Sequence, residues 1–232
     1  MSIETQLQLH NNLVRVEQTI AEAAQQFGRN LEEIQLVTVT KSRTLKEIYF
    51  AIETGLQHFG ESYVQEAFPK IEILSTSGIV WHFIGPIQSN KTQMIAKYFD
   101  WVQSLASLKH AQRLSDQRPD RLPPLNVCIE VNVDREPQKS GIPLEEVADF
   151  AREIGQFPRL QLRGLMAVPA HHEDFELQRQ SCHALYQAYQ QLKNLGFQLD
   201  TLSMGMTGDM VAAIAEGSTM LRIGTGIFGE RK

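Results

Sequence analysis

The sequence has few cysteines, no excess of basic residues and no apolar run long enough to span a membrane. Its two cysteines among 232 residues, Cys128 in an apolar run and Cys182 in a helical pattern, argue against a disulfide framework or a thiolate metal site. A formal net charge of -5, with no stripe of Lys and Arg interleaved with aromatics, argues against nucleic acid as a partner. The first segment is polar and acidic, unlike a signal peptide, so we expect an unprocessed cytoplasmic protein that does not bind membranes.

The sequence also lacks a persuasive group of metal ligands. His171, His172, Glu173 and Asp174 are consecutive, and consecutive side chains point apart. A solvated loop before a helix is the expected structure there, and we expect no metal site.

What the sequence does contain is an alternation of short apolar runs and amphipathic segments. Runs rich in β-branched residues without polar alternation are typical of strands buried on both faces of a parallel sheet. Strands are expected at residues 34–40, 56–60, 80–85, 101–105, 125–133, 160–168, 197–202 and 219–224. Helices are expected at residues 3–27, 44–53, 61–74, 89–98, 107–117, 143–154 and 173–195.

This alternation predicts the α/β class and a (β/α)8 TIM barrel that occupies residues 1–232 as a single domain, preceded by an N-terminal helix. The last expected strand has almost no helix after it. We expect the helix at residues 3–27 to cover that gap. No long exposed apolar face is evident, so we expect a monomer.

Two glycine-rich turns near the C-terminus are the first candidate for a functional site. SMGMTGD at residues 203–209 and RIGTG at residues 222–226 each follow a short apolar run. Small residues after a strand let backbone N–H groups close around an anion, and a helix opening at Thr207 would direct its positive end at the same point. In a barrel, the loops after strands seven and eight commonly bind phosphate. The sequence therefore predicts a phosphate cup.

Lys41 is the second candidate. It follows the apolar run IQLVTVT, so in a closed barrel it lies at the carboxyl end of the first strand, next to the cup. An amine shielded from water can attack an aldehyde to form an imine. An amine beside a phosphate cup is the minimum apparatus for holding pyridoxal 5′-phosphate (PLP) as an internal aldimine. Spacing alone favours the simpler interpretation, a surface lysine in a loop.

Several segments, in this order, resemble motifs of the pyridoxal phosphate homeostasis protein family, also called the YggS/PROSC family. They are VTVTKSR around Lys41, FGESYVQEA, WHFIGPIQSNK, KSG at residues 139–141, RGLMAVPA, LSMGMTGDM and LRIGTGIFGER. The resemblance covers nearly the whole chain, and the combination is highly specific. It implies a barrel of PLP fold type III, similar to the amino-terminal domain of alanine racemase, with the cofactor attached to Lys41 as an aldimine.

The resemblance also implies roles for other residues. Arg222 would face the pyridine nitrogen, and the phosphate would be cupped by Ser203, Thr207, Gly224 and Thr225. His82 and Asn132 are further candidates for cofactor contact, although His82 could instead donate hydrogen bonds at a strand end. Lys139, which follows the fifth strand, could be a second site for the aldehyde.

Two positions depart from the family pattern. Ser62 stands where asparagine is usual, so any contact from that side chain is open. Thr207 stands where serine is common, a change that keeps the hydroxyl.

Arg222 affects which reactions a bound PLP could support. A carboxylate opposite the ring nitrogen would keep that nitrogen protonated, whereas a permanently cationic guanidinium can only donate a hydrogen bond. The nitrogen then stays unprotonated, and carbanion chemistry is weakly supported. From the residues alone, pairing of Arg222 with an acidic neighbour inside the barrel is an equally good interpretation.

Three functions are open at this point. The resemblance implies a carrier that holds PLP for intracellular homeostasis and delivers it, with apo PLP-dependent enzymes as candidate recipients and no robust turnover of its own. The alternative is a PLP-dependent amino-acid racemase or a related enzyme. A cofactor-free lyase that forms an imine with a phosphorylated sugar would also need a lysine and a phosphate cup in a barrel.

Overall fold

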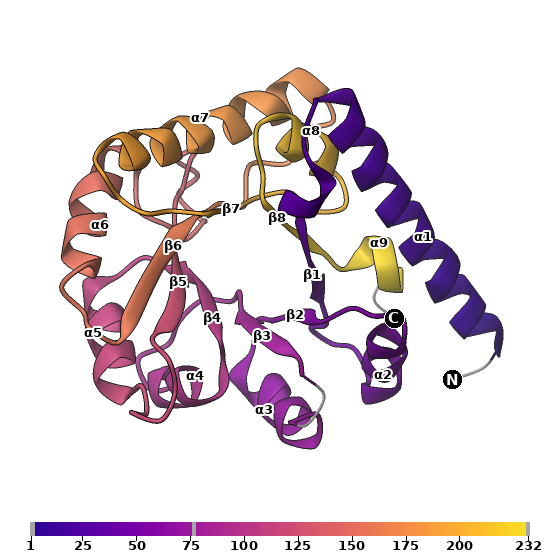
Figure 1. Ribbon diagram of the computed structural model, residues 1–232, viewed down its shortest axis with the longest axis horizontal. Coiled ribbons are helices and arrows are strands. Elements are labelled where there is room, and N and C mark those ends of the chain that lie inside the picture. The colour runs from indigo at the N-terminus through magenta and orange to yellow at the C-terminus, as the bar shows by residue number, and fades with distance from the viewer. Residues whose placement is uncertain (1–2, 76–77, 231–232) are drawn as a thin grey trace.

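The structure is a computed structural model that describes residues 3–75 and 78–230, so Arg231, at the end of the last motif, lies outside the described residues. Parallel strands form a closed ring in chain order, and β8 pairs with β1 (Figure 1). The strands are β1 Gln35–Val39, β2 His58–Glu61, β3 Val80–Phe83, β4 Trp101–Leu105, β5 Leu125–Glu130, β6 Leu160–Met166, β7 Thr201–Ser203 and β8 Met220–Ile223. The predicted (β/α)8 barrel is confirmed.

Helices surround the ring of strands (Figure 1). They are α1 Ile3–Gln26, α2 Leu45–Glu53, α3 Val64–Ile73, α4 Thr92–Tyr98, α5 Leu108–Gln117, α6 Val147–Ile154, α7 Phe175–Asn194, α8 Met210–Ala215 and α9 Thr225–Phe228, with short 3-10 helices at Leu31–Glu33 and Leu144–Glu146. None of the helices in the described ranges is long and apolar enough to cross a membrane.

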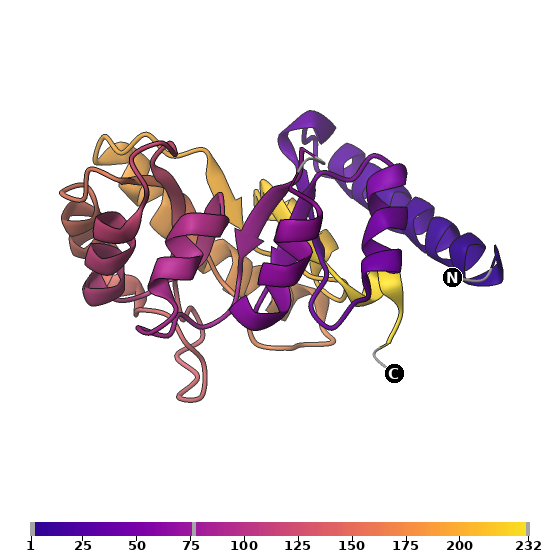
Figure 2. The same ribbon diagram turned by 90° about the horizontal axis from the view of Figure 1, so that it is seen from below.

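The first helix covers the last part of the barrel, as the sequence predicts. Helix α1 lies outside the ring at one edge of the molecule and packs against α8 and α9 (Figures 1 and 2). Its buried side recurs at steps of three and four residues, with Leu9, Leu13, Val16 and Ile20 facing inward. The Asn12 amide also donates to the Ile227 carbonyl at 3.0 Å, which ties α1 to α9.

Near the C-terminus, two predicted boundaries were wrong, and the short helix after the last strand agrees with the expectation of almost no helix there. The seventh strand is Thr201–Ser203 and lacks residues 197–200. The helix expected to open at Thr207 begins at Met210, because the Asp209 carboxylate accepts from the Met206 N–H at 2.6 Å and holds the intervening residues as a turn. A four-residue helix, α9, follows β8.

Apolar side chains fill the layer between the strands and the helices, while the barrel interior is mixed. The interior apolar cluster is small, comprising Val37, Trp101, Cys128, Met166 and Met220. Cys128 is fully buried, and burial raises the pKa of its thiol to about 12. It is a core residue and not a reactive thiol. Buried polar side chains of the strands, among them His82, Gln103, Ser203 and Arg222, lie next to this cluster.

A buried ion pair fixes the end of β1. The Lys70 ammonium on α3 donates to the Glu61 carboxylate at 2.7 Å and to the Thr40 carbonyl at 2.9 Å. The Thr40 hydroxyl donates to the same Glu61 oxygen at 2.7 Å. Glu61 is fully buried, and burial raises its pKa against the opposing effect of Lys70. Since Thr40 directly precedes Lys41, these contacts hold the backbone from which Lys41 extends.

Replacing Lys70 with methionine would leave the Glu61 carboxylate buried without its cation. We expect the free energy of unfolding, measured by urea titration, to fall by about 3 kcal/mol, the usual scale for breaking a buried pair. The double variant K70M/E61Q should recover much of that loss, because no buried charge is then left alone. Lys97→Met, at an exposed lysine on α4, is the matched control. Equal stability of K70M and K97M would contradict this role.

Candidate functional site

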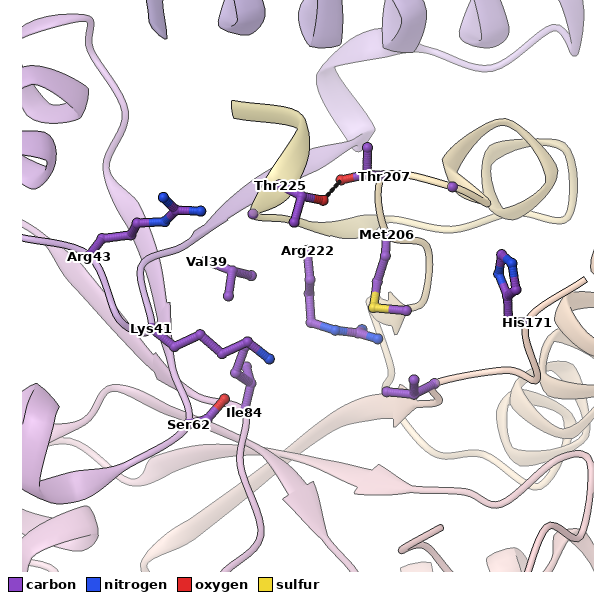
Figure 3. Close-up of a pocket in the computed structure, with 13 residues that line it drawn as sticks. Val39, Lys41, Arg43, Ser62, Ile84, His171, Met206, Thr207, Arg222 and Thr225 are labelled. Atoms are coloured by element: carbon purple, nitrogen blue, oxygen red, sulfur yellow. Dashed lines mark hydrogen bonds between the residues drawn. The ribbon is translucent and has the colours of Figure 1, made fainter. Parts of the chain in front are cut away.

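A cavity of about 410 Å³ opens at the carboxyl ends of the strands (Figure 3). Its walls come from the ends of β1, β2, β3, β6, β7 and β8 and the loops that follow them. The lining residues are Val39, Lys41, Arg43, Ser62, Ile84, Val168, His171, Met206, Thr207, Gly208, Arg222, Gly224 and Thr225. The structure thus brings together Lys41 and the two glycine-rich turns that the sequence singled out.

Lys41 extends into the cavity from the end of β1, and Arg222 extends into the same space from β8 (Figure 3). A tight turn follows the lysine, with the Arg43 N–H donating to the Thr40 carbonyl at 3.0 Å. Ser42 adopts a positive φ of 61° in this turn, and the Glu66 carboxylate holds its N–H at 2.9 Å. A non-glycine residue with positive φ is uncommon and needs such support.

The two turns meet through hydroxyl groups. The Thr225 hydroxyl donates to the Thr207 hydroxyl at 3.1 Å, and the Gly226 N–H donates to the same Thr207 oxygen at 3.0 Å. A Cβ at Gly226 would lie 3.0 Å from Ile223 and 3.1 Å from Thr207, so glycine is what permits this approach. The two hydroxyls can rotate toward a ligand and so form a donor set suited to an anion.

Arg222 forms the floor of the cavity and is only 4% exposed. Its guanidinium donates to the Ser203 hydroxyl at 2.5 Å and to the Ala167 carbonyl at 2.7 Å. No carboxylate in the described residues lies within ion-pair distance of it, so the acidic partner considered from sequence is not found. Burial lowers the pKa of Arg222, but an arginine starts so high that it stays cationic.

Three residues predicted for the site lie outside the cavity lining. Ser203 is fully buried beneath Arg222 and donates to the Gln103 amide oxygen at 2.7 Å. His82 is fully buried, with its ring nitrogens 2.9 Å from His58 and 2.9 Å from Gln103. The Asn132 amide donates to the Glu136 carbonyl at 2.9 Å and so shapes the loop after β5. Direct contact of these three with a ligand stays a prediction.

Lys139 lies in that same loop. It pairs with Glu136 and donates to the carbonyls of Val168 at 3.2 Å and Pro169 at 2.9 Å. Val168 lines the cavity and Lys139 does not, so Lys139 supports the backbone of a lining residue from outside the cavity.

Sequence reasoning missed several lining residues, among them Arg43, His171 and Met206. Each follows a strand, and that position was the available signal. Arg43 is held by the Phe228 carbonyl at 3.4 Å and by the Gly229 carbonyl, and it lies over the Phe228 ring. His171 was considered only as a metal ligand, and the described ranges contain no group of residues able to hold a metal.

The donor set fits a phosphorylated aldehyde. The cavity volume falls in the range of small-molecule sites. One end offers hydroxyl donors for a phosphate, the other offers a lysine amine for a carbonyl carbon, and a cation lies on the floor between them. This is the set of groups that PLP requires of a protein.

Comparison with known proteins agrees with this geometry. The family model described as alanine racemase, N-terminal domain, matches residues 12–232. The pyridoxal phosphate homeostasis protein of Escherichia coli (strain K12) is 47% identical over 224 residues, covering 95% of this chain and 96% of that protein.

Solved structures of proteins with similar sequences share this fold. A crystal structure of an unknown protein from Bifidobacterium adolescentis is 32% identical, with a TM-score of 0.91, covering 98% of this chain and 97% of that chain. PipY of Synechococcus elongatus, solved with PLP bound, is 30% identical, with a TM-score of 0.79, covering 90% of this chain and 100% of that chain. The chain therefore belongs to the alanine racemase N-terminal domain family and, within it, to the pyridoxal phosphate homeostasis proteins.

Proposed function

We propose that this protein binds PLP at Lys41 and serves as a carrier of the cofactor in vitamin B6 homeostasis, without robust catalytic turnover of its own. The observation that supports this most is the convergence of the Lys41 amine, the Thr207–Thr225 hydroxyl pair and a buried arginine in one cavity. The similarity to PipY, a protein solved with PLP bound, supports the same ligand.

Each group has a proposed part in binding. The Lys41 amine would condense with the aldehyde carbon and release its oxygen as water, and the turn held by the Thr40 carbonyl and the Glu66 carboxylate directs that amine into the cavity. Thr207, Gly224 and Thr225 take the phosphate, and Gly226 allows their turns to meet. Bound PLP supplies a reactive aldehyde and an aromatic ring able to accept electrons.

Arg222 limits the chemistry that bound PLP would support, and together with the similarity to pyridoxal phosphate homeostasis proteins it is the basis for proposing a carrier. A guanidinium facing the ring nitrogen of PLP would donate a hydrogen bond to it and, unlike a carboxylate, would not keep that nitrogen protonated, so the ring would draw electrons weakly. Tight but reversible attachment is then the main property of the site. The recipients that we propose are apo PLP-dependent enzymes, and we propose that the protein works as a monomer in the cytoplasm.

Borohydride reduction of protein loaded with PLP should fix the cofactor to Lys41, because that amine lines the cavity. Peptide mapping by mass spectrometry locates the adduct, and the loaded protein should be yellow. Lys41→Ala should lose the colour, while Lys139→Ala should keep it, because Lys139 stands behind the cavity wall. A principal adduct on another lysine would overturn the assignment. Colourless wild-type protein that is trapped only by a sugar phosphate would favour the lyase alternative.

Removing the phosphate donors should weaken PLP binding without affecting pyridoxal, which has no phosphate. Thr207→Val and Thr225→Val should each raise the dissociation constant for PLP about tenfold, the scale of one hydrogen bond to a charged group. Thr19→Val, on α1 and outside the cavity, is the matched control. Absorbance titration measures all of these affinities. A similar loss for pyridoxal would mean that these hydroxyls support the fold and not the phosphate.

The carrier and racemase functions predict opposite outcomes for two assays. Mixing loaded protein with an apo PLP enzyme should activate that enzyme faster than spontaneous release of PLP allows. Incubation with L-alanine should give racemisation no faster than free PLP gives. Transfer limited by spontaneous release would remove the delivery function, and steady racemisation well above free PLP would replace the carrier with an enzyme.

A further inference from the structure

A row of polar side chains crosses the barrel interior, which in this fold is usually filled by branched apolar residues. The row starts at the cavity floor and continues through β7, β4 and β3 to the first residue of β2, at the opposite end of the barrel. Its consecutive hydrogen bonds measure 2.5, 2.7, 2.9 and 2.9 Å, and its members are Arg222, Ser203, Gln103, His82 and His58.

The direction of these hydrogen bonds follows from the first member. A guanidinium can only donate, so the Ser203 oxygen accepts from Arg222 and its own proton goes to the Gln103 amide oxygen. The Gln103 amide nitrogen then donates to Nδ1 of His82. His82 therefore carries its proton on Nε2 and donates it to Nδ1 of His58.

Met220 supports this orientation of the Gln103 amide. Its sulfur lies 3.1 Å from the Gln103 amide nitrogen, as expected for a donor against a weak acceptor. A flipped amide would place a carbonyl oxygen against the sulfur and would leave the Ser203 proton without an acceptor. Such an unsatisfied buried group costs stability, so the flip is disfavoured.

Both imidazoles are suited to such a row because they are neutral. Burial lowers the pKa of His82 well below its usual value and lowers the pKa of His58. The charge of the Asp100 carboxylate acts in the opposite direction and raises the pKa of His58. The His82 ring also stacks on Trp101, with 5.3 Å between the ring centres, which fixes the plane of the imidazole.

We propose that Gln103 is a positioning residue for the cavity, acting through Ser203. By taking the Ser203 proton, Gln103 leaves the lone pairs of that hydroxyl to Arg222, and the guanidinium is then held between Ser203 and the Ala167 carbonyl. This inference rests on the proposed function, in which Arg222 meets the pyridine ring of PLP. Gln103 itself is fully buried and does not line the cavity.

The first test uses protein without PLP. Nitrogen-15 NMR of the histidine side chains reports which ring nitrogen carries the proton. In the wild type, His82 and His58 should both be neutral and protonated on Nε2. Gln103→Met, which keeps the length of the side chain and removes the amide, should release His82 into a mixture of tautomers. A wild-type His82 protonated on Nδ1, or a His82 unchanged in Q103M, would overturn the proposal.

The second test measures the effect on the cavity. In Q103M the dissociation constant for PLP should rise about tenfold, the scale of one hydrogen bond to a charged group. The absorption maximum of the bound cofactor should also shift, because the guanidinium loses its fixed place, while reduction should still label Lys41. Gln156→Met, at an exposed position after α6, is the matched control. An unchanged affinity and spectrum in Q103M would contradict a positioning role, since a merely structural residue changes stability alone.

A double-mutant cycle separates action through Ser203 from independent effects. Ser203→Ala should produce the same loss as Q103M, and the double variant should be no weaker than either single variant. Losses in affinity that multiply in the double variant would show that Gln103 does not act through Ser203.

If Q103M does not fold, S203A is tested in its place, and we expect the same spectral shift and the same mixture of His82 tautomers. Failure of wild-type protein to bind PLP would remove the proposed function, and the NMR result would still decide whether the row exists.

Discussion

The hydrogen bonds between β1 and β8 are the constraint on which the site depends. Val37 pairs with Arg222 and Thr38 with Ile223, so the first and last strands leave the sheet side by side. Lys41 and the turn at Gly224 are then neighbours although most of the chain separates them. The approach is close enough that a Cβ at Gly224 would lie 3.3 Å from Val39. Barrel closure thus places an amine beside an anion-binding turn, which neither end of the chain could do alone.

Burying the Arg222 guanidinium has a cost that the surrounding structure must offset. Removing a cation from water is expensive unless its donors are satisfied. Here the compensation comes from a carbonyl and a hydroxyl and not from a carboxylate, so the positive charge is held without being neutralised. The same requirement accounts for the polar row behind Arg222. Each buried polar group that accepts or donates a hydrogen bond in the row has further hydrogen-bonding atoms, and these need partners of their own.

The sequence predicted the parts of this structure that depend on local pattern and missed those that depend on side-chain direction. Apolar runs predicted the strands, and the ends of those strands predicted that Lys41 lies beside the two glycine-rich turns, whereas the place of Arg222 in the site was implied by the family resemblance. The start of α8 was missed because the Asp209 carboxylate closes a turn that resembles a helix cap. Gln103 was missed because nothing in WVQSL indicates that its amide points into the barrel toward a serine one hundred residues away.

The titratable side chains that line the cavity also matter for the choice between a carrier and a racemase. Inverting a carbon centre requires one group to remove a proton from one face and a second group to return it on the other. Among the described lining residues, the titratable groups besides Lys41 are Arg43, Arg222 and His171. Arginine is a poor base because it stays protonated. His171 is exposed on the loop after β6, where water can take its place in exchanging protons. Among the described lining residues, Lys41 and the exposed His171 are therefore the candidates for proton transfer, and the reversible binding of an aldehyde that we propose needs only the Lys41 amine.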